Sequence, residues 1–141
     1  MSTLNKNTSF TLTELMIVVV IIGIIAGFAI PNFTRAVERA HRRDAVVQLT
    51  NVHAANQIFR AENGSYWPSA DNQNLAAINA ALDLSILPNG MTYECDIGGG
   101  PVGTTFTCTA VRDAPAPSFT VTVTQAPVSG TNPSCTAGAC P

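Results

Sequence analysis

Apolar residues are distributed very unevenly along the chain and are most concentrated in its first third. The sixteen residues from Leu15 to Ile30 include no charged or strongly polar side chain, and only three polar residues separate them from Phe10. A helix needs about 20 apolar residues to cross a bilayer core about 30 Å thick. We therefore expect residues 10–33 to span a membrane. The run should be retained, because a cleaved secretory signal has a shorter apolar core and Ala29 is poorly placed for the A-x-A pattern that ends one.

Helix-compatible sequence continues well beyond this apolar run. Between residues 10 and 61 there are only one proline and two glycines. Roughly 50 helical residues make a rod about 75 Å long, which is far longer than a bilayer core is thick. We therefore expect one long helix whose second half, residues 34–62, lies outside the membrane and stops at Asn63-Gly64.

The second half of this helix is amphipathic. Its apolar residues recur every three or four positions and mark one face for burial. The members of this face are Ala45, Leu49, Val52, Ala55 or Asn56, and Phe59. Such a face needs a cover from elsewhere in the chain.

Beyond the helix the period of the pattern changes. Residues 63–90 form a connection in which Leu75, Ile78, Ala81 and Leu82 keep a helical period, which predicts a short helix. From residue 91 onward three stretches alternate apolar with polar residues, as antiparallel strands with one wet face do. Their apolar positions are Met91, Tyr93 and Cys95; Phe106, Cys108 and Ala110; and Phe119, Val121 and Val123. The expected fold class is α+β, with the long helix packed on a small antiparallel sheet within residues 91–141.

All four cysteines lie in this last region. An even number of cysteines in a small exported domain favours disulfides, and four cysteines allow three pairings. Cys95 and Cys108 fall on the inward faces of successive strands, so we favour a bond between them, which leaves Cys135 with Cys140. No CxxC pair occurs and neither histidine lies nearby, so we expect no metal site.

Charge is segregated along the chain. Between residues 35 and 43 there are four arginines and one glutamate, whereas residues 61–141 hold six acidic residues and one arginine, a net charge of −5. The basic block is short and helical, so paired or solvated charge is its simplest interpretation. Neither block indicates a nucleic acid partner.

Glu14 is the residue with the clearest chemical implication. A carboxylate at the edge of a membrane helix is energetically costly, so we expect it to have a specific partner. The simpler alternative is that Glu14 sits in water at the interface. Removal of residues 1–9 would create a cation, the amine of Phe10, and the amine of a neighbouring copy could reach Glu14. Because a paired charge is tolerated in an apolar surround and an unpaired one is not, such a pair would select one axial stagger.

The stretch FTLTELMIVVVIIGIIAGFAIPNF, residues 10–33, resembles the N-terminal segment of type IV pilins and of type II secretion pseudopilins. The resemblance implies a leader of residues 1–9, cleavage between Ser9 and Phe10 by a prepilin peptidase, and N-methylation of Phe10. The sequence departs from the family at two positions. Ser9 stands where glycine is usual, and Thr13 where a hydrophobic residue is usual.

Two further features of the apolar run concern assembly. Gly23 and Gly27 form a GxxxG motif, which permits close helix approach in lipid, although small residues are also common in such helices. Pro31 removes the backbone donor that would bond to Gly27 and should bend or loosen the helix. By resemblance to pilin filaments, we expect the stretch from Gly23 to Pro31 to lose helical order on assembly.

These features favour a structural role over an enzymatic one. The chain has no plausibly placed Ser, His and Asp set and no CxxC pair, and we expect neither catalysis nor a cofactor. The resemblance implies a homopolymeric type IV pilus subunit that serves adhesion, twitching motility or DNA uptake. It would be stored in the bacterial inner membrane and moved to a cell-surface filament by an assembly ATPase and a platform protein. The alternatives are a periplasmic type II secretion pseudopilin and a minor pilin.

Overall fold

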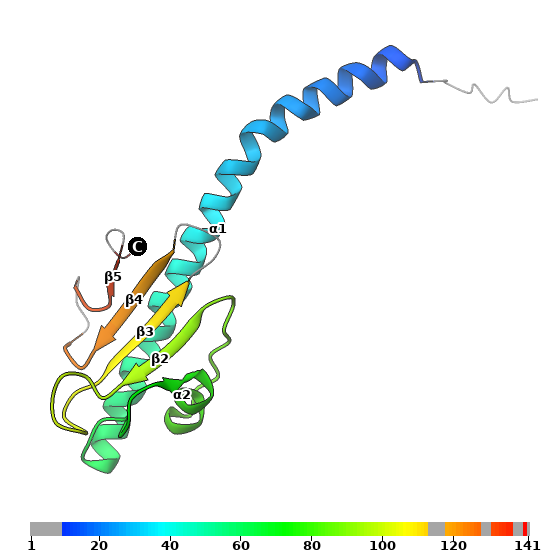
Figure 1. Cartoon of the computed structure of the whole chain (residues 1–141). Helices are drawn as coiled ribbons and strands as arrows, with labels where there is room; N and C mark the ends of the chain where they lie inside the picture. Colours follow the sequence, from blue (N-terminus) through cyan, green and yellow to red (C-terminus); the bar gives the residue numbers. More distant parts are fainter. Residues whose placement is uncertain (1–9, 113–117, 128–130, 137–139, 141) are drawn as a thin grey trace, which may run out of the picture. The chain divides into compact units, whose positions relative to one another are not determined.

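The computed structural model describes residues 10–112, 118–127, 131–136 and 140 (Figure 1). The chain divides into two compact units, residues 1–38 and residues 39–141. Helix α1, Leu12–Asn63, begins in the first unit and ends in the second. Each unit is described in turn.

The described part of the first unit is the apolar half of α1. Its large side chains are exposed throughout, from Leu15 at 57% to Ile30 at 64%. By length and composition the helix can cross a membrane, and none of its most apolar window of 18 residues is buried. An apolar surface of this extent needs lipid or other protein around it, because monomers in water rarely expose so large a patch.

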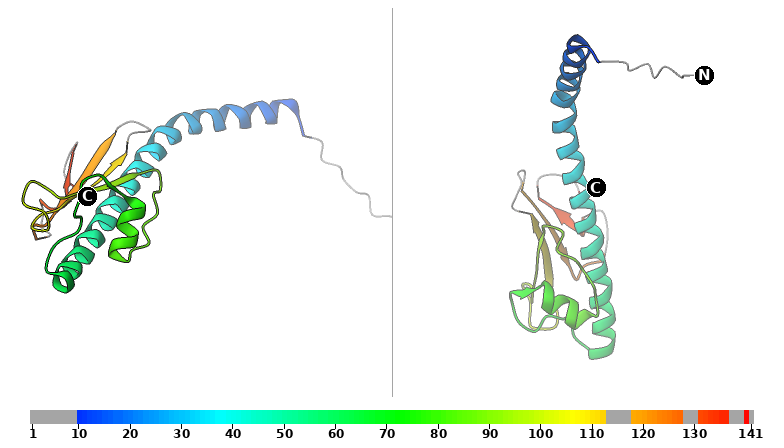
Figure 2. Two further views of the ribbon diagram at one scale, coloured as in Figure 1. Left: turned by 60° about the horizontal axis from the view of Figure 1, so that its bottom comes forward. Right: turned by 90° about the vertical axis from the view of Figure 1, so that its right-hand side faces the viewer.

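The second unit packs the rest of α1 against a five-stranded antiparallel sheet (Figures 1 and 2). The strands follow one another in chain order and are β1, Gln73–Asn74; β2, Thr92–Asp96; β3, Thr107–Arg112; β4, Phe119–Thr124; and β5, Ser134–Cys135. The three longer strands are those that the alternating pattern predicts. β1 and β5 escape a sequence prediction because two residues are too few to alternate.

The connection between α1 and the sheet contains α2, Leu75–Leu82, which confirms the predicted short helix. Its first turn is capped by Asn74, whose side-chain oxygen accepts a hydrogen bond from the backbone N–H of Ala77 at 3.1 Å. Upstream, α1 stops where predicted. Gly64 adopts a positive φ of 77° and donates its N–H to the carbonyl oxygen of Arg60 at 2.8 Å.

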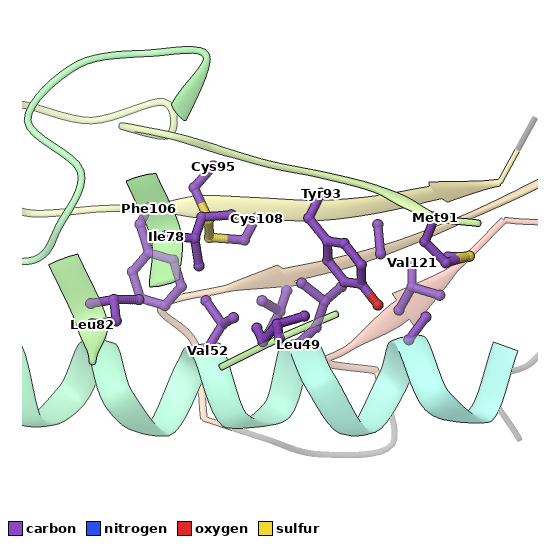
Figure 3. Packing of buried hydrophobic residues seen from close by; sticks show 14 of the residues in the cluster. Leu49, Val52, Ile78, Leu82, Met91, Tyr93, Cys95, Phe106, Cys108 and Val121 are labelled. Carbon is purple, nitrogen blue, oxygen red and sulfur yellow. A yellow bond between two sulfur atoms is a disulfide. The ribbon is translucent and has the colours of Figure 1, made fainter. Parts of the chain in front are cut away.

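The core of the second unit lies between α1 and one face of the sheet. Leu49 and Val52 of α1 are fully buried and point toward Tyr93, Phe106 and Val121 (Figure 3). Within each long strand the inward positions are buried and the threonine-rich positions are not. The predicted α+β fold is therefore confirmed, and the sheet covers the apolar face of the helix.

The structure resolves a position on that face which the sequence left open between Ala55 and Asn56. Asn56 is fully buried and Ala55 is half-buried. The Asn56 side-chain oxygen accepts a hydrogen bond from the Trp67 backbone N–H at 2.9 Å, and its amide nitrogen donates to the Trp67 carbonyl. Because both polar atoms are paired, the buried amide is tolerated and anchors the chain that follows the helix.

Two disulfides close the sheet region. Cys95 and Cys108 are direct partners across β2 and β3, with Cα atoms 4.1 Å apart, and their sulfurs are bonded. The second bond joins Cys135 of β5 to Cys140. The strand pattern favours the first of these pairs, and the second is the pair that then remains.

Candidate assembly site

The start of α1 is organised by Thr11 and Glu14. The Glu14 Oε2 atom accepts hydrogen bonds from the Thr11 backbone N–H at 2.9 Å and from Thr11 Oγ1 at 2.7 Å. In return, the Glu14 N–H donates to Thr11 Oγ1 at 3.3 Å. This reciprocal arrangement is a capping box, which satisfies backbone donors that the first turn of a helix leaves unpaired.

The capping role of Thr11 was missed by the sequence prediction. The Thr-x-x-Glu pattern that carries it is plain in the sequence, and it precedes an apolar run as capping boxes do. Glu14 therefore has a local function in its own chain in addition to any function between chains. The two functions are compatible, because the cap occupies only one of the two carboxylate oxygens.

The surroundings of Glu14 are open and apolar. Phe10 is 74% exposed and Leu12 77% exposed, and Glu14 itself is exposed. Within the described residues Glu14 has hydrogen bonds to Thr11 and no ion pair with any cation. A carboxylate placed among apolar side chains without a cation is suited to receive one from another molecule.

Gly23 and Gly27 lie farther along the same half of α1. A Cβ added at either glycine would meet nothing within 4 Å, so both positions are open on the helix surface. Whatever these glycines accommodate must therefore come from lipid or from another chain. α1 stays helical across Pro31, and a loss of helical order on assembly stays a prediction.

The sequence-predicted site residues divide between the two units. Phe10, Glu14, Gly23 and Gly27 lie in the first unit, and the four disulfide cysteines lie in the second. Ser9 lies outside the described residues. No group of three or more His, Cys, Asp or Glu residues that could hold a metal occurs in the described part of the chain.

Two known family models match this chain, one over its N-terminal segment and one over most of the remainder. Residues 4–30 match a model described as the prokaryotic N-terminal methylation motif. Residues 31–137 match a model described as type IV minor pilin ComP, DNA uptake sequence receptor. An N-terminal methylation motif leading into a long helix defines the class of type IV pilin-like proteins. The second match covers most of the length of this chain, and the chain therefore belongs to this family of type IV pilins.

Relatives with curated names come from both branches of that class. The chain is 38% identical over 78 residues to type II secretion system core protein G of Vibrio cholerae, an alignment of 55% of this chain and 52% of that protein. It is 44% identical over 61 residues to the type IV major pilin protein PilA of Myxococcus xanthus, covering 43% of this chain and 28% of that protein. It is 31% identical over 100 residues to the type IV narrow pilus major component PilA5 of Thermus thermophilus, covering 57% and 86%.

The chain thus spans about half the length of the secretion relatives that it matches. No solved structure matches it at a significant level. Pilins and pseudopilins are structural subunits and not enzymes, so the expected structural role is confirmed at that level. The apolar helix and the methylation motif indicate membrane anchoring followed by assembly into a pilus or pseudopilus.

Proposed function

We propose that this chain is a type IV pilus subunit that is cut between Ser9 and Phe10 and then polymerises. In the polymer, the new Phe10 amine of one copy pairs with Glu14 of its neighbour. The observation that carries this proposal is the exposed carboxylate of Glu14, which stands at the start of an apolar helix with no cation beside it in the described residues. The match of residues 4–30 to the methylation motif supports the cut.

An amine on a neighbouring copy suits Glu14 better than the amine of its own chain. The N-terminus of a helix already carries a partial positive charge, which disfavours a second positive charge such as an amine at the same place. The Phe10 amine is therefore stabilised when a carboxylate of another copy lies beside it. Glu14 lies four residues from Phe10, which is about 6 Å along a helix axis. A neighbour shifted by about that distance would bring its amine level with Glu14.

Such a pair would select one axial offset between neighbouring copies. In lipid or in a packed bundle of apolar helices, an uncompensated carboxylate costs several kcal/mol, on the order of a buried unpaired charge. Copies with the wrong offset would leave both charges unpaired. Cleavage thus becomes the step that changes a stored membrane protein into an assembling one, since the unprocessed chain has no amine at Phe10.

A minor pilin is the second candidate function, and the observation that favours it is the match of residues 31–137 to a minor pilin family. The DNA uptake receptor named in that family description fits the charges of residues 61–141 less well. DNA binding depends largely on Lys and Arg contacts to phosphates. Residues 61–141 carry a net charge of −5, and Arg112, their one basic residue, is 7% exposed and donates to the Gly90 carbonyl oxygen at 2.9 Å.

Glu14→Gln separates the two functions of this side chain. Glutamine can fill the same position of a capping box, but it carries no charge to pair with an amine. We expect the Glu14→Gln chain to insert in the membrane and to be cut normally, while surface filaments seen by electron microscopy are lost. Thr11→Val is the matched control, because it removes the hydroxyl half of the cap and leaves the carboxylate; it should still assemble.

The reverse pattern would contradict the proposal. If Glu14→Gln filaments were normal, the charge pair would be wrong. If Thr11→Val and Glu14→Gln lost filaments to the same degree, helix capping would be the sole function of the pair.

A further inference from the structure

The part of α1 in the second unit carries unpaired positive charge at one end. Arg39 and Arg43 are both exposed and lie four residues apart, where like charges on a helix repel. In the described part of the chain neither side chain forms an ion pair or a hydrogen bond. Arg42, between them, is half-buried with its guanidinium over the Phe119 ring at 5.1 Å from the centroid. Among the described residues of the second unit, Arg39 and Arg43 are therefore the guanidinium groups most open to another molecule.

At the other end of the same helix segment, negative charge lies beside a surface groove. A groove of about 540 Å³ lies between α1 and the C-terminal end of α2. It is lined mainly by small or apolar residues, among them Ala54, Ala55, Phe59 and Leu84. We call it the α1–α2 groove. The alanines leave the space that larger side chains would fill.

Two carboxylates, Glu62 of α1 and Asp83 at the end of α2, also line this groove. Asp83 adopts a left-handed backbone conformation with φ 51°, and its N–H closes α2 by donating to the carbonyl oxygen of Asn79. Both carboxylates are exposed, and neither has a cation or a side-chain hydrogen bond among the described residues. The groove thus combines an apolar floor with an acidic edge.

We propose that the α1–α2 groove receives the Arg39 and Arg43 side chains of a second copy of this chain. This inference rests on the proposed function, because it supplies a second contact for the same polymer. Arginine suits such a site, since its methylene stem packs on apolar surface while its guanidinium binds carboxylates. Glu62 and Asp83 of one copy then neutralise the arginine pair of the other.

The chain itself indicates that the occupant is a second copy. Both complementary surfaces lie on one molecule but at opposite ends of one helix segment, so a copy cannot satisfy its own charges there. Contacts between two different surfaces of identical chains do not close into a dimer and instead propagate as a filament or ring. A partner without exposed cations would leave the two carboxylates unmatched.

The helix spacing fixes the offset between the two copies. Arg43 and Glu62 are 19 residues apart in the sequence, and Arg39 is four residues farther away. At 1.5 Å per residue, the contact joins copies shifted by roughly 30 to 35 Å along the helix axis. The Phe10 to Glu14 pair needs a shift of only about 6 Å. The two contacts therefore join each copy to a near neighbour and to one about five or six positions along, as in a helical lattice.

Charge exchange in the full-length chain tests the groove. One variant carries Glu62→Arg with Asp83→Asn, because asparagine tolerates the left-handed conformation at position 83. A second carries Arg39→Glu with Arg43→Glu, and a third combines all four changes. The readout is the fraction of chain recovered in sheared surface filaments. We expect each double variant to lose about ten-fold or more, and the combined variant to recover most of that loss.

Ala76→Arg is the control, since Ala76 is an exposed residue in the first turn of α2 and lies outside the groove lining; it should assemble as the unaltered chain does. Normal filaments from both double variants would overturn the groove contact, and so would a combined variant that recovers nothing. Ala54→Trp fills the groove without changing charge and should also reduce assembly. If it alone did so, an apolar occupant would replace the arginines. Absence of filaments from the unaltered chain would instead defeat the proposed function.

Discussion

Tyr93 shows how one side chain is governed by its surroundings. It is 2% exposed within the core, and its hydroxyl makes no hydrogen bond with any described residue. Burial disfavours the charged phenolate, and the negative charge of Asp44 disfavours it further. Together they raise the pKa of Tyr93 from 10.0 to about 12. The inward face of β2 was predictable from alternation, but the unmet hydroxyl was not, because it depends on what α1 places opposite.

The raised pKa of Tyr93 predicts a loss of stability at alkaline pH. The unfolded chain releases this proton near pH 10 and the folded chain only near pH 12, so the stabilising contribution is complete below pH 10 and disappears between the two values. Tyr93→Phe should abolish that contribution to the pH dependence. It should also stabilise the fold by about 1 kcal/mol at neutral pH, because it removes a buried hydroxyl without a partner.

The fluorescence of Trp67, the one tryptophan of the chain, can follow urea unfolding in detergent at pH 8, 10 and 11.5. An equal fall in stability with pH for Tyr93→Phe and the unaltered chain would contradict this account.

At the scale of elements, α1 combines two segments with different partners. Its apolar half has no protein cover in the first unit, whereas its amphipathic half is covered by the sheet. The sequence predicts the second half well because a period of 3.6 residues marks Leu49 and Val52 for the same face. It predicts the short strands β1 and β5 poorly. Gln73 pairs with Cys95 only because tertiary packing brings them together.

Two valines on α1 give a matched test of that face. Val52 is fully buried and Val47 is 56% exposed. Val52→Ala should lower the free energy of unfolding by about 2 kcal/mol, from two lost methyl groups and the cavity they leave. Val47→Ala should change it by no more than about 0.5 kcal/mol. Both changes alter helix propensity equally, so the difference between them reports burial alone. Equal effects on urea unfolding would mean that α1 packs on the sheet through another face.

At the scale of the whole molecule, composition predicts the role better than any single site does. Three features require other copies of the chain or an oxidising compartment outside the cytoplasm. They are the exposed apolar half of α1, the opposite charges at the two ends of its amphipathic half, and the disulfide bonds of the second unit. The sequence indicated all three, because the apolar run and the motif around Phe10 and Glu14 mark the helix, and the segregated charges and the four cysteines can be read from it directly. The α1–α2 groove could not be predicted from the sequence, because the position of α2 beside α1 depends on the path of the connecting segment in the folded chain.

The most direct test of the polymer claim is the mass of the chain recovered from sheared surface filaments. Our account predicts a chain that begins at Phe10, carries one added methyl group on its amine and retains both disulfides. Filaments containing a chain that still begins at Met1 would contradict it, since that chain has no Phe10 amine for Glu14. Recovery of the processed chain from membranes alone, with none in filaments, would contradict it equally.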